Sequence, residues 1–104
     1  MSFVIEVDNG YRIVKPRNTY WSLQELQDLV GGYIERVPSE SSHVDIYVNE
    51  EGLLHQLPLN VAGTRVAGHY GHAQAHPVPF QRIGLVGPVA FIDVKELNEE
   101  QEDN

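Results

Sequence analysis

Three histidines, His69, His72 and His76, lie close together in the chain and are the strongest candidates for chemistry. Neutral imidazole is the commonest metal ligand, and spacings of three and four residues can bring such rings to one ion. Three protein ligands and a water make a typical catalytic zinc site. However, the segment offers no carboxylate ligand, and Gly71 with the nearby prolines does not fix the backbone. One hypothesis is therefore a small metal-binding protein or metal-dependent enzyme, and the other is histidines that face solvent or a partner.

Other candidate catalytic groups lack the arrangement that their chemistry requires. A run of serines precedes His43, but adjacency in sequence is not triad geometry, and no glycine-flanked turn from strand to helix surrounds a serine. Glu50 and Glu51 stand in a predicted turn, where water surrounds both carboxylates. Gly84 and Gly87 lack the lysine and the following helix of a phosphate-binding loop. We therefore expect no catalytic residue and no bound cofactor.

The chain has 104 residues, with 41% hydrophobic and 21% charged side chains and no cysteine. This composition is typical of one globular domain, and it excludes disulfides, thiolate zinc sites and cysteine nucleophiles. The first ten residues lack the basic and apolar regions of a signal peptide. No apolar run approaches the roughly 20 residues that span a bilayer. We expect a cytoplasmic protein that does not insert into membranes.

Acidic residues outnumber basic ones by 15 to 7, which gives a net charge of −8. Six of the acidic residues fall between Asp93 and Asn104, and no apolar residue follows Leu97. We expect one folded domain over residues 1–94 and a flexible acidic tail over residues 95–104. Because no basic stripe exists, direct binding to nucleic acid is disfavoured. The tail is interpreted either as a solubilising segment or as a mimic of nucleic acid that binds a basic groove.

The N-terminal residues have the pattern of a β-hairpin. Residues 3–8 and 11–15 flank Asn9-Gly10, a pair typical of a two-residue type I′ turn. A turn of this type places Ile5 opposite Val14. This register predicts that one face of the hairpin is apolar and directed to the core, with Phe3, Ile5, Val7 and Val14 on it.

A helix is predicted from Ser22 to Gly31. Ser22 and Glu25 match a capping box, and Trp21 with Leu26 matches the hydrophobic staple that accompanies it. Gly31 suits the left-handed residue that follows a helix. The staple explains Trp21 better than a role as an exposed binding aromatic.

Further strands and a second helix follow. Strands are predicted at Tyr33–Val37, His43–Val48, Leu53–Leu57, Ile83–Val86 and Val89–Val94. In the second of these, alternation directs His43, Asp45 and Tyr47 outward. Asn60 is the predicted N-cap of a short helix ending at Gly68, and residues 69–81 are a predicted loop. Together these elements predict a single α+β domain. A mainly antiparallel sheet of five or six strands packs one face on the first helix, and the short helix covers an edge or an end of the sheet.

Three stretches together resemble a known family: Leu26–Val37 with the letters LVGGYIE, Asn49–Asn60 with NEEG and LPLN, and Val86–Phe91. Their order and spacing over roughly residues 3–94 resemble short proteins of bacteriophages and bacterial mobile elements, catalogued as a domain of unknown function. The resemblance implies a phage-encoded accessory protein acting in the host cytoplasm. It carries over no catalytic residue, and the loop from His69 to Pro79 departs from the family pattern.

Binding of a partner through the protein surface is the remaining functional hypothesis. We expect the partner-binding residues to be Tyr47, Tyr70, His72 and Phe80, because aromatic side chains are enriched where interfaces gain most of their energy. The alternative is that the tyrosines only cover the rim of the sheet. The functional prediction is a non-enzymatic protein that binds, and inhibits, a host macromolecule, with a host protein as the expected partner. Exposed strand edges beside Pro16 and Pro38 also predict self-association as a homodimer.

Overall fold

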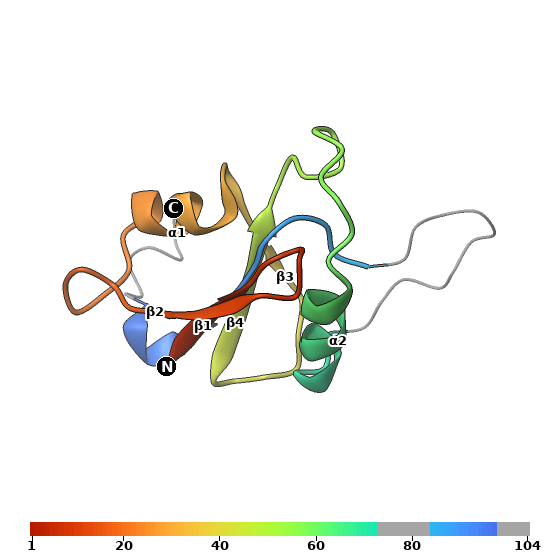
Figure 1. The fold of residues 1–104 in the computed structure, drawn as a ribbon. Helices are drawn as coiled ribbons and strands as arrows, with labels where there is room; N and C mark the ends of the chain where they lie inside the picture. The colour runs from red at the N-terminus through yellow and green to blue at the C-terminus, as the bar shows by residue number, and fades with distance from the viewer. Residues whose placement is uncertain (73–83, 98–104) are drawn as a thin grey trace.

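The computed structural model describes residues 1–72 and 84–97. Within them, five strands form one antiparallel sheet in the order β2-β1-β5-β4-β3. The strands are β1 (Ser2–Ile5), β2 (Tyr11–Val14), β3 (Ile34–Val37), β4 (Val44–Asn49) and β5 (Val89–Asp93). The helices are α1 (Leu23–Val30), α2 (Val61–His69) and the short 3-10 helix η1 (Val94–Glu96). Figure 1 shows the sheet between α1 and α2, which confirms the predicted α+β class.

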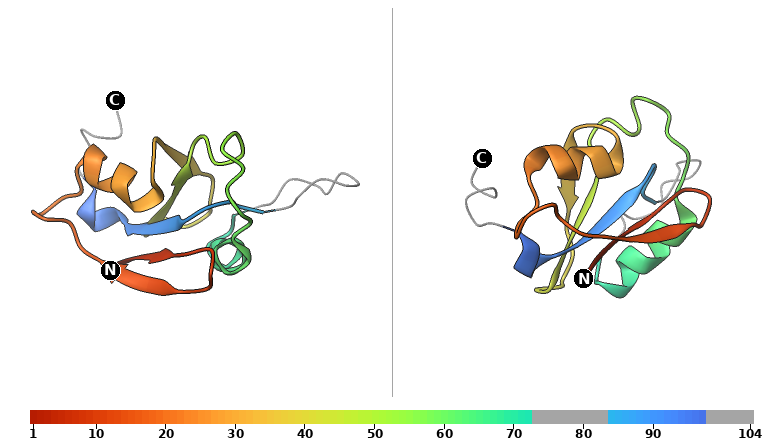
Figure 2. Two further views of the ribbon diagram at one scale, coloured as in Figure 1. Left: turned by 45° about the horizontal axis from the view of Figure 1, so that its top comes forward. Right: turned by 60° about the vertical axis from the view of Figure 1, so that its left-hand side comes forward.

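The two helices cover opposite faces of the sheet (Figure 2). On one face, α1 contributes Leu26 and Val30 to a core that includes Val4, Ala90 and Ile92. On the other face, Ala67 of α2 packs in a second core, and the sheet contributes Ile5, Val37, Ile46, Val48, Val89 and Phe91 to it. The second helix therefore packs on the face opposite α1, and Tyr11 and Ile13 of β2 on the same side stay exposed.

The central strand β5 is apolar on both faces because both faces of the sheet are covered. In β5, Val89, Ala90, Phe91 and Ile92 are all fully buried. The Phe91 ring stacks on Phe3 of β1 with 4.8 Å between the ring centres. Burying each such side chain contributes roughly 1.5–3 kcal/mol, so this strand supplies much of the stability of the domain.

Both predicted ends of α1 and the predicted N-cap of α2 are confirmed. The Ser22 hydroxyl accepts from the Glu25 N–H, and the Glu25 carboxylate accepts from the Ser22 N–H, as in a capping box. Gly31 ends α1 in the left-handed region, with φ of 81°. Trp21 is buried against the α1 side of the sheet, as the staple predicted. Asn60 caps α2, although this helix continues past Gly68 to His69.

The predicted register of the first hairpin is wrong. Ile5 pairs with Tyr11, not with Val14, and the loop runs from Glu6 to Gly10. Asn9 has a positive φ of 73°, but the loop is longer than a two-residue turn. The shift by an odd number of residues places Val14 on the α1 side and Ile5 on the α2 side. Helices cover both faces of the sheet, so both faces of the hairpin need apolar residues. The prediction that only one face of the hairpin is directed to the core was therefore wrong.

Two further expectations from the sequence are wrong for related reasons. Tyr47 of β4 does not face outward; it is only 7% exposed and packs in the α1-side core. Residues Leu53–Leu57 do not form a strand but a series of turns. Alternation of apolar and polar residues indicates a solvent-facing side only when one face of the sheet lacks a cover.

The folded body extends beyond Val94, where the sequence placed its end. The helix η1 includes Glu96, and Leu97 is buried in the α1-side core. The Glu96 carboxylate accepts from the Ser2 hydroxyl at 2.5 Å and from the Trp21 indole N–H at 3.1 Å. These contacts join the two ends of the described chain to Trp21, the residue before the N-cap of α1. Residues 98–104 of the predicted acidic tail lie outside the described residues.

Candidate functional site

The structure places two of the three predicted metal ligands. His69 is exposed in the last turn of α2, and the His72 Nδ1 lies 2.7 Å from the Pro38 carbonyl oxygen. Since a carbonyl only accepts, this hydrogen bond places a proton on Nδ1. His76 lies outside the described residues. Within residues 1–72 and 84–97, no group of three potential ligands comes together.

The predicted partner-binding aromatics do not form one surface in the described structure. Tyr47 is buried, and the Tyr70 ring packs on Phe91 with 5.8 Å between ring centres. His72 is bonded to Pro38, and Phe80 lies outside the described residues. Tyr47 is therefore a core residue, and the part of Tyr70 that contacts Phe91 supports the α2 side of the sheet.

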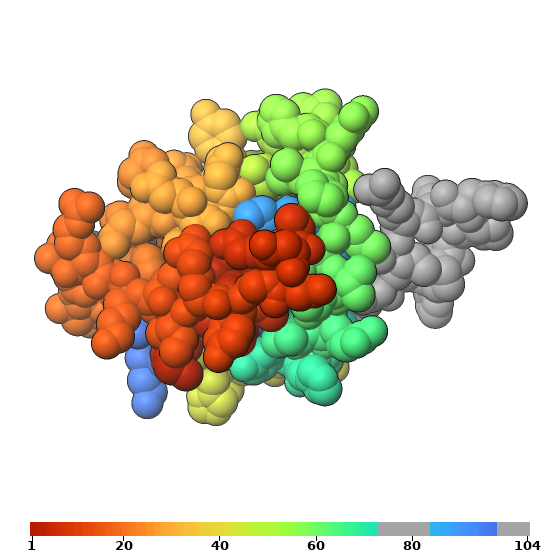
Figure 3. Space-filling view, viewed as in Figure 1, coloured from red at the N-terminus to blue at the C-terminus, as the bar shows by residue number. Residues whose placement is uncertain are grey.

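A different apolar feature is exposed on the turn that follows β4. Leu53 is 77% exposed and Leu54 is 75% exposed, the highest fractions among the large hydrophobic side chains of the described chain. The turn stands out from the body in both the ribbon and the space-filling views (Figures 1 and 3). Burying a leucine contributes roughly 1.5–3 kcal/mol, so two adjacent exposed leucines forgo several kcal/mol of a typical stability of 5–15 kcal/mol. We call residues 50–57 the leucine turn.

Backbone hydrogen bonds hold the leucine turn in one conformation. Four of them close it: Gly52 N–H to Asn49 O at 3.0 Å, His55 N–H to Glu51 O at 2.9 Å, Gln56 N–H to Leu53 O at 3.1 Å, and Leu57 N–H to Gly52 O at 2.9 Å. Gln56 adopts a left-handed φ of 56°, which reverses the chain. Because the turn is built in this way, its leucines are presented to solvent by the fold.

Gly52 fixes the leucine turn to the body of the domain. A Cβ at this position would lie 2.8 Å from Val86 Cγ2 and 3.2 Å from the Asn49 carbonyl oxygen. Leu57, at the end of the turn, approaches the glycine that precedes β5, since a Cβ on Gly87 would lie 2.7 Å from Leu57 Cδ1. Only a residue without a side chain allows the turn to approach Val86 this closely.

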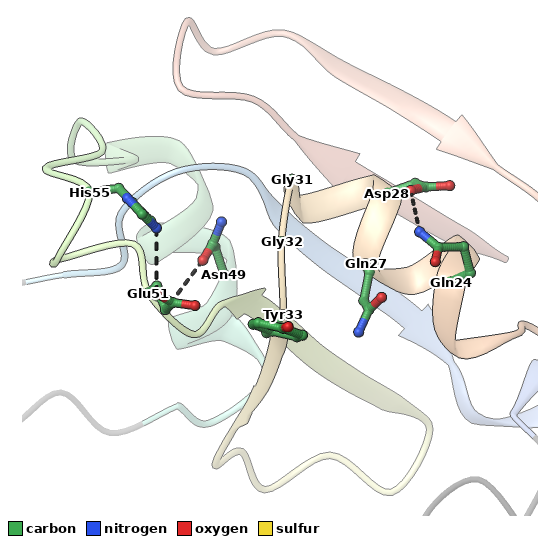
Figure 4. A pocket seen from close by; sticks show the side chains of 9 residues that line it. All are labelled: Gln24, Gln27, Asp28, Gly31, Gly32, Tyr33, Asn49, Glu51 and His55. Carbon is green, nitrogen blue, oxygen red and sulfur yellow. Dashed lines mark hydrogen bonds and ion pairs between the residues drawn. The ribbon is translucent and has the colours of Figure 1, made fainter.

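An open polar hollow of about 470 Å³ lies beside the leucine turn, at the C-terminal end of α1 (Figure 4). Its lining residues come from α1, from the cap of that helix, and from the turn: Gln24, Gln27, Asp28, Gly31, Gly32, Tyr33, Asn49, Glu51 and His55. The Nε2 of His55 lies 3.5 Å from the Oε2 of Glu51, a contact that is an ion pair when the imidazole is protonated. The lining contains no lysine or arginine.

Hydrogen bonds to backbone groups shift the acidity of two carboxyls, and both are structural. The N–H groups of Arg17 and Ser22 donate to Glu25 and hold its pKa below the usual value. The N-terminal ammonium and the Lys95 N–H do the same to the pKa of Asp93. Neither carboxyl lines the hollow, so these shifts indicate fixed turns and caps rather than an acid–base centre.

A comparison with known protein families shows to which family the chain belongs. A family model for a domain of unknown function, DUF3846, matches residues 1–103. The chain belongs to the DUF3846 family. The resemblance to a domain of unknown function is thereby confirmed, and it assigns no activity. No curated protein and no solved structure matches this DUF3846 chain.

The motifs that carried the resemblance build the scaffold of this DUF3846 domain. In LVGGYIE, Gly31 caps α1, and a Cβ on Gly32 would lie 2.8 Å from Asn49 Nδ2. In LPLN, Asn60 caps α2 and is fully buried. These residues are explained by the fold and need no catalytic role. Neither α1 nor α2, in the described part of the chain, is long and apolar enough to cross a bilayer.

The leucine turn was not predicted from the sequence. Residues 53–57 follow the turn at Asn49–Gly52, and their leucines suggested a strand that returns to the sheet. Leucine content does not distinguish a buried strand from a projecting turn. The polar residue Gln56, between Leu54 and Leu57, was the available signal against a strand. A strand that returned beside β4 would have continued the alternation of β-branched residues seen in β4.

Proposed function

We propose that this domain is a non-enzymatic accessory protein that binds a host protein through the leucine turn. Its single strongest support is the exposure of Leu53 and Leu54, 77% and 75%, on a turn that its own backbone hydrogen bonds hold in place. Scattered single apolar residues are normal on a protein surface, whereas adjacent, fixed and projecting ones are typical of interaction sites. The leucines enter an apolar pocket of the partner.

The charge around the leucine turn selects the chemistry of the partner. Glu50 and Glu51 flank the leucines on one side, and Asp28 lines the adjoining hollow, whose lining holds no lysine or arginine. A partner pocket rimmed by lysine or arginine complements this surface and speeds encounter. The same carboxylates oppose contact with an anionic membrane or with a phosphate backbone.

The cellular setting is the second part of the proposal. The LVGGYIE and NEEG…LPLN stretches resemble proteins of phages and bacterial mobile elements, which supports a phage-encoded protein in the host cytoplasm. Its effect on the host protein is inhibition, since an added chain over an apolar pocket blocks other ligands of that pocket. The metal hypothesis requires His76 and the nucleic-acid mimic requires the tail, and both lie outside the described residues.

A matched pair of variants tests the proposal. Leu53→Ser with Leu54→Ser removes both apolar side chains, while Leu23→Ser alters a leucine that is 54% exposed on α1. We expect a host protein to be retained by the wild type and by Leu23→Ser. Truncating interface residues of this importance costs upwards of about 2 kcal/mol, so the double variant should bind the purified partner at least ~30-fold more weakly in calorimetry. Equal affinity of all three proteins would contradict the proposal.

A further inference from the structure

The outer edge of β2 carries backbone groups that the fold leaves unpaired. In the strand order β2 lies at one end, with β1 as its neighbour. The Glu6 N–H donates to the Gly10 carbonyl at 2.7 Å, and this marks a hydrogen-bonded pair of the ladder. Such pairs alternate along antiparallel strands, so Tyr11 and Ile13 direct their N–H and C=O groups away from β1. The ladder with β1 does not use these groups, and no turn or loop hydrogen bond between backbone groups of residues 1–72 and 84–97 involves them.

The same edge exposes apolar side chains on one face. Tyr11 is 70% exposed and Ile13 is 53% exposed. Their partners in the register are Ile5 and Phe3, so both side chains lie on the α2 side of the sheet. An edge strand with free backbone groups and apolar side chains is a template for pairing with another strand.

We propose that β2 pairs with β2 of a second copy of this chain, antiparallel, across a twofold axis at Ile13. In this register Ile13 lies opposite Ile13 of the second copy, and Tyr11 lies opposite its Lys15. Tyr11 and Ile13 alternate with Arg12 and Val14, so both direct their backbone groups outward. Ile13 exchanges both hydrogen bonds with its copy across the axis, and Tyr11 meets Lys15, the residue that follows β2. The two sheets become one continuous sheet.

Charge and register favour pairing with a second copy at the β2 edge and disfavour it at the β3 edge. On the α1 side of the seam, Arg12 lies opposite Val14 of the second copy and keeps its own ion pair with Glu6 at 3.2 Å. The proposed register therefore places no like charges directly opposite each other. At the β3 edge, a twofold axis at either middle residue sets Glu35 against Glu35 or Arg36 against Arg36, which is destabilising.

The proposed seam is independent of the leucine turn. The turn follows β4, near β3, at the far end of the strand order from β2. Figure 3 shows the first hairpin, in red and orange, on the front of the molecule and the turn at its top. A dimer through β2 leaves both leucine turns free and makes the assembly bivalent for the partner. Loss of the dimer and loss of partner binding are therefore separate outcomes.

The test uses the full chain in sedimentation or light scattering over a range of concentrations. We expect a mass that approaches twice 11.7 kDa as concentration rises. Ile13→Pro removes an N–H that the fold does not use, and proline is tolerated at such edge positions. This variant should keep the circular dichroism of the wild type and dimerise at least ~10-fold more weakly. A wild type that stays monomeric, or a folded variant that dimerises unchanged, overturns the proposal.

Cross-linking supplies a second measurement that does not depend on the proline variant. The chain has no cysteine, so Ile13→Cys introduces a single thiol. Opposed residues of a hydrogen-bonded pair lie about 5.5 Å apart at Cα, within the range of a disulfide. Mild oxidation should give a covalent dimer with Ile13→Cys and little with Glu35→Cys on β3. Equal cross-linking at the two positions would contradict the assignment to β2.

Discussion

The side-chain amide nitrogen of Asn60 lies 2.8 Å from the backbone oxygen of Ile5, 55 residues earlier in the chain. The same nitrogen donates to the Gly87 carbonyl at 2.9 Å, and the amide oxygen accepts from the Gly63 N–H at 2.8 Å. One buried side chain therefore caps α2 and joins it to the end of β1 and to the turn before β5. Through these bonds it fixes α2 on its face of the sheet.

Replacing Asn60 should destabilise the whole domain. Asn60→Ala removes a helix cap, worth about 1 kcal/mol, and removes one donor from each of the Ile5 and Gly87 carbonyl oxygens, at roughly 0.5–1.5 kcal/mol for each lost hydrogen bond. We expect the free energy of unfolding to fall by at least ~2 kcal/mol in urea titrations. Asn18→Ala, at an exposed position, is the matched control and should change it by less than ~0.5 kcal/mol. Equal stability of the two variants would show that the buried bonds are unimportant.

Glu96 should behave as a core residue even though it belongs to the acidic end of the sequence. Glu96→Ala leaves the buried Ser2 hydroxyl and the Trp21 indole N–H without their acceptor. The expected cost is about 1–3 kcal/mol. Trp21 is the single tryptophan, so its fluorescence reports the change directly. Glu35→Ala, on the exposed side of β3, is the control, and a Glu96 variant as stable as this control would contradict the role.

The contacts of Glu96 and Leu97 determine which deletion can test the hypothesis that the acidic tail mimics nucleic acid. Deleting residues 95–104 would remove Glu96 and Leu97, which support the fold, along with the acidic tail. A loss of function in that deletion would not distinguish unfolding from loss of the tail. Deleting residues 98–104 alone separates the two, and an unchanged effect on the host would exclude the mimic.

Stability should depend on Glu25 at acid pH. Hydrogen bonds from the Arg17 and Ser22 N–H groups hold the pKa of Glu25 below its usual value of 4.5. The folded state therefore favours the charged form, so the contribution is fully present above the unfolded pKa and is lost as pH falls through the folded pKa. Glu25→Gln should show a shallower loss of stability below about pH 5 than the wild type. Identical slopes in urea titrations across this range would contradict the capping role.

Two glycine substitutions should change stability in opposite directions. Gly52→Ala forces a Cβ to 2.8 Å from Val86 Cγ2, and such overpacking costs about 1–3 kcal/mol. Gly68→Ala places a Cβ in open space inside α2, where alanine is favoured over glycine by up to ~1 kcal/mol. Thermal unfolding checks both signs. A Gly52→Ala protein as stable as the wild type would show that the leucine turn is not held against Val86.

Local signals in the sequence predicted the parts of the fold that depend on a few adjacent residues. The Ser22 cap, the left-handed Gly31 and the Asn60 cap are all in place, because each rests on hydrogen bonds within one turn of chain. The hairpin register was wrong, because it depends on which face of β1 receives α2. That information lies in residues 61–69, far along the chain.

The candidate site was harder to predict than the fold. Tyr47 looked like an exposed aromatic because alternation assigned it to an uncovered face, yet α1 covers that face. Leu53 looked like a strand residue because apolar content does not record whether a partner strand is present. In both cases the deciding fact is tertiary: where α1 lies in the first, and how Gly52 directs the chain in the second.

Site-specific photo-cross-linking shows directly whether the leucine turn contacts a host protein. A benzophenone attached at Leu54→Cys, in a chain with no other cysteine, reports whatever contacts the leucine turn in a host lysate. We expect one dominant covalent adduct with a host protein from this position and none from Leu23→Cys on α1. The same adducts from both positions, or no adduct from Leu54→Cys, would contradict the assignment of the leucine turn as the partner-binding site.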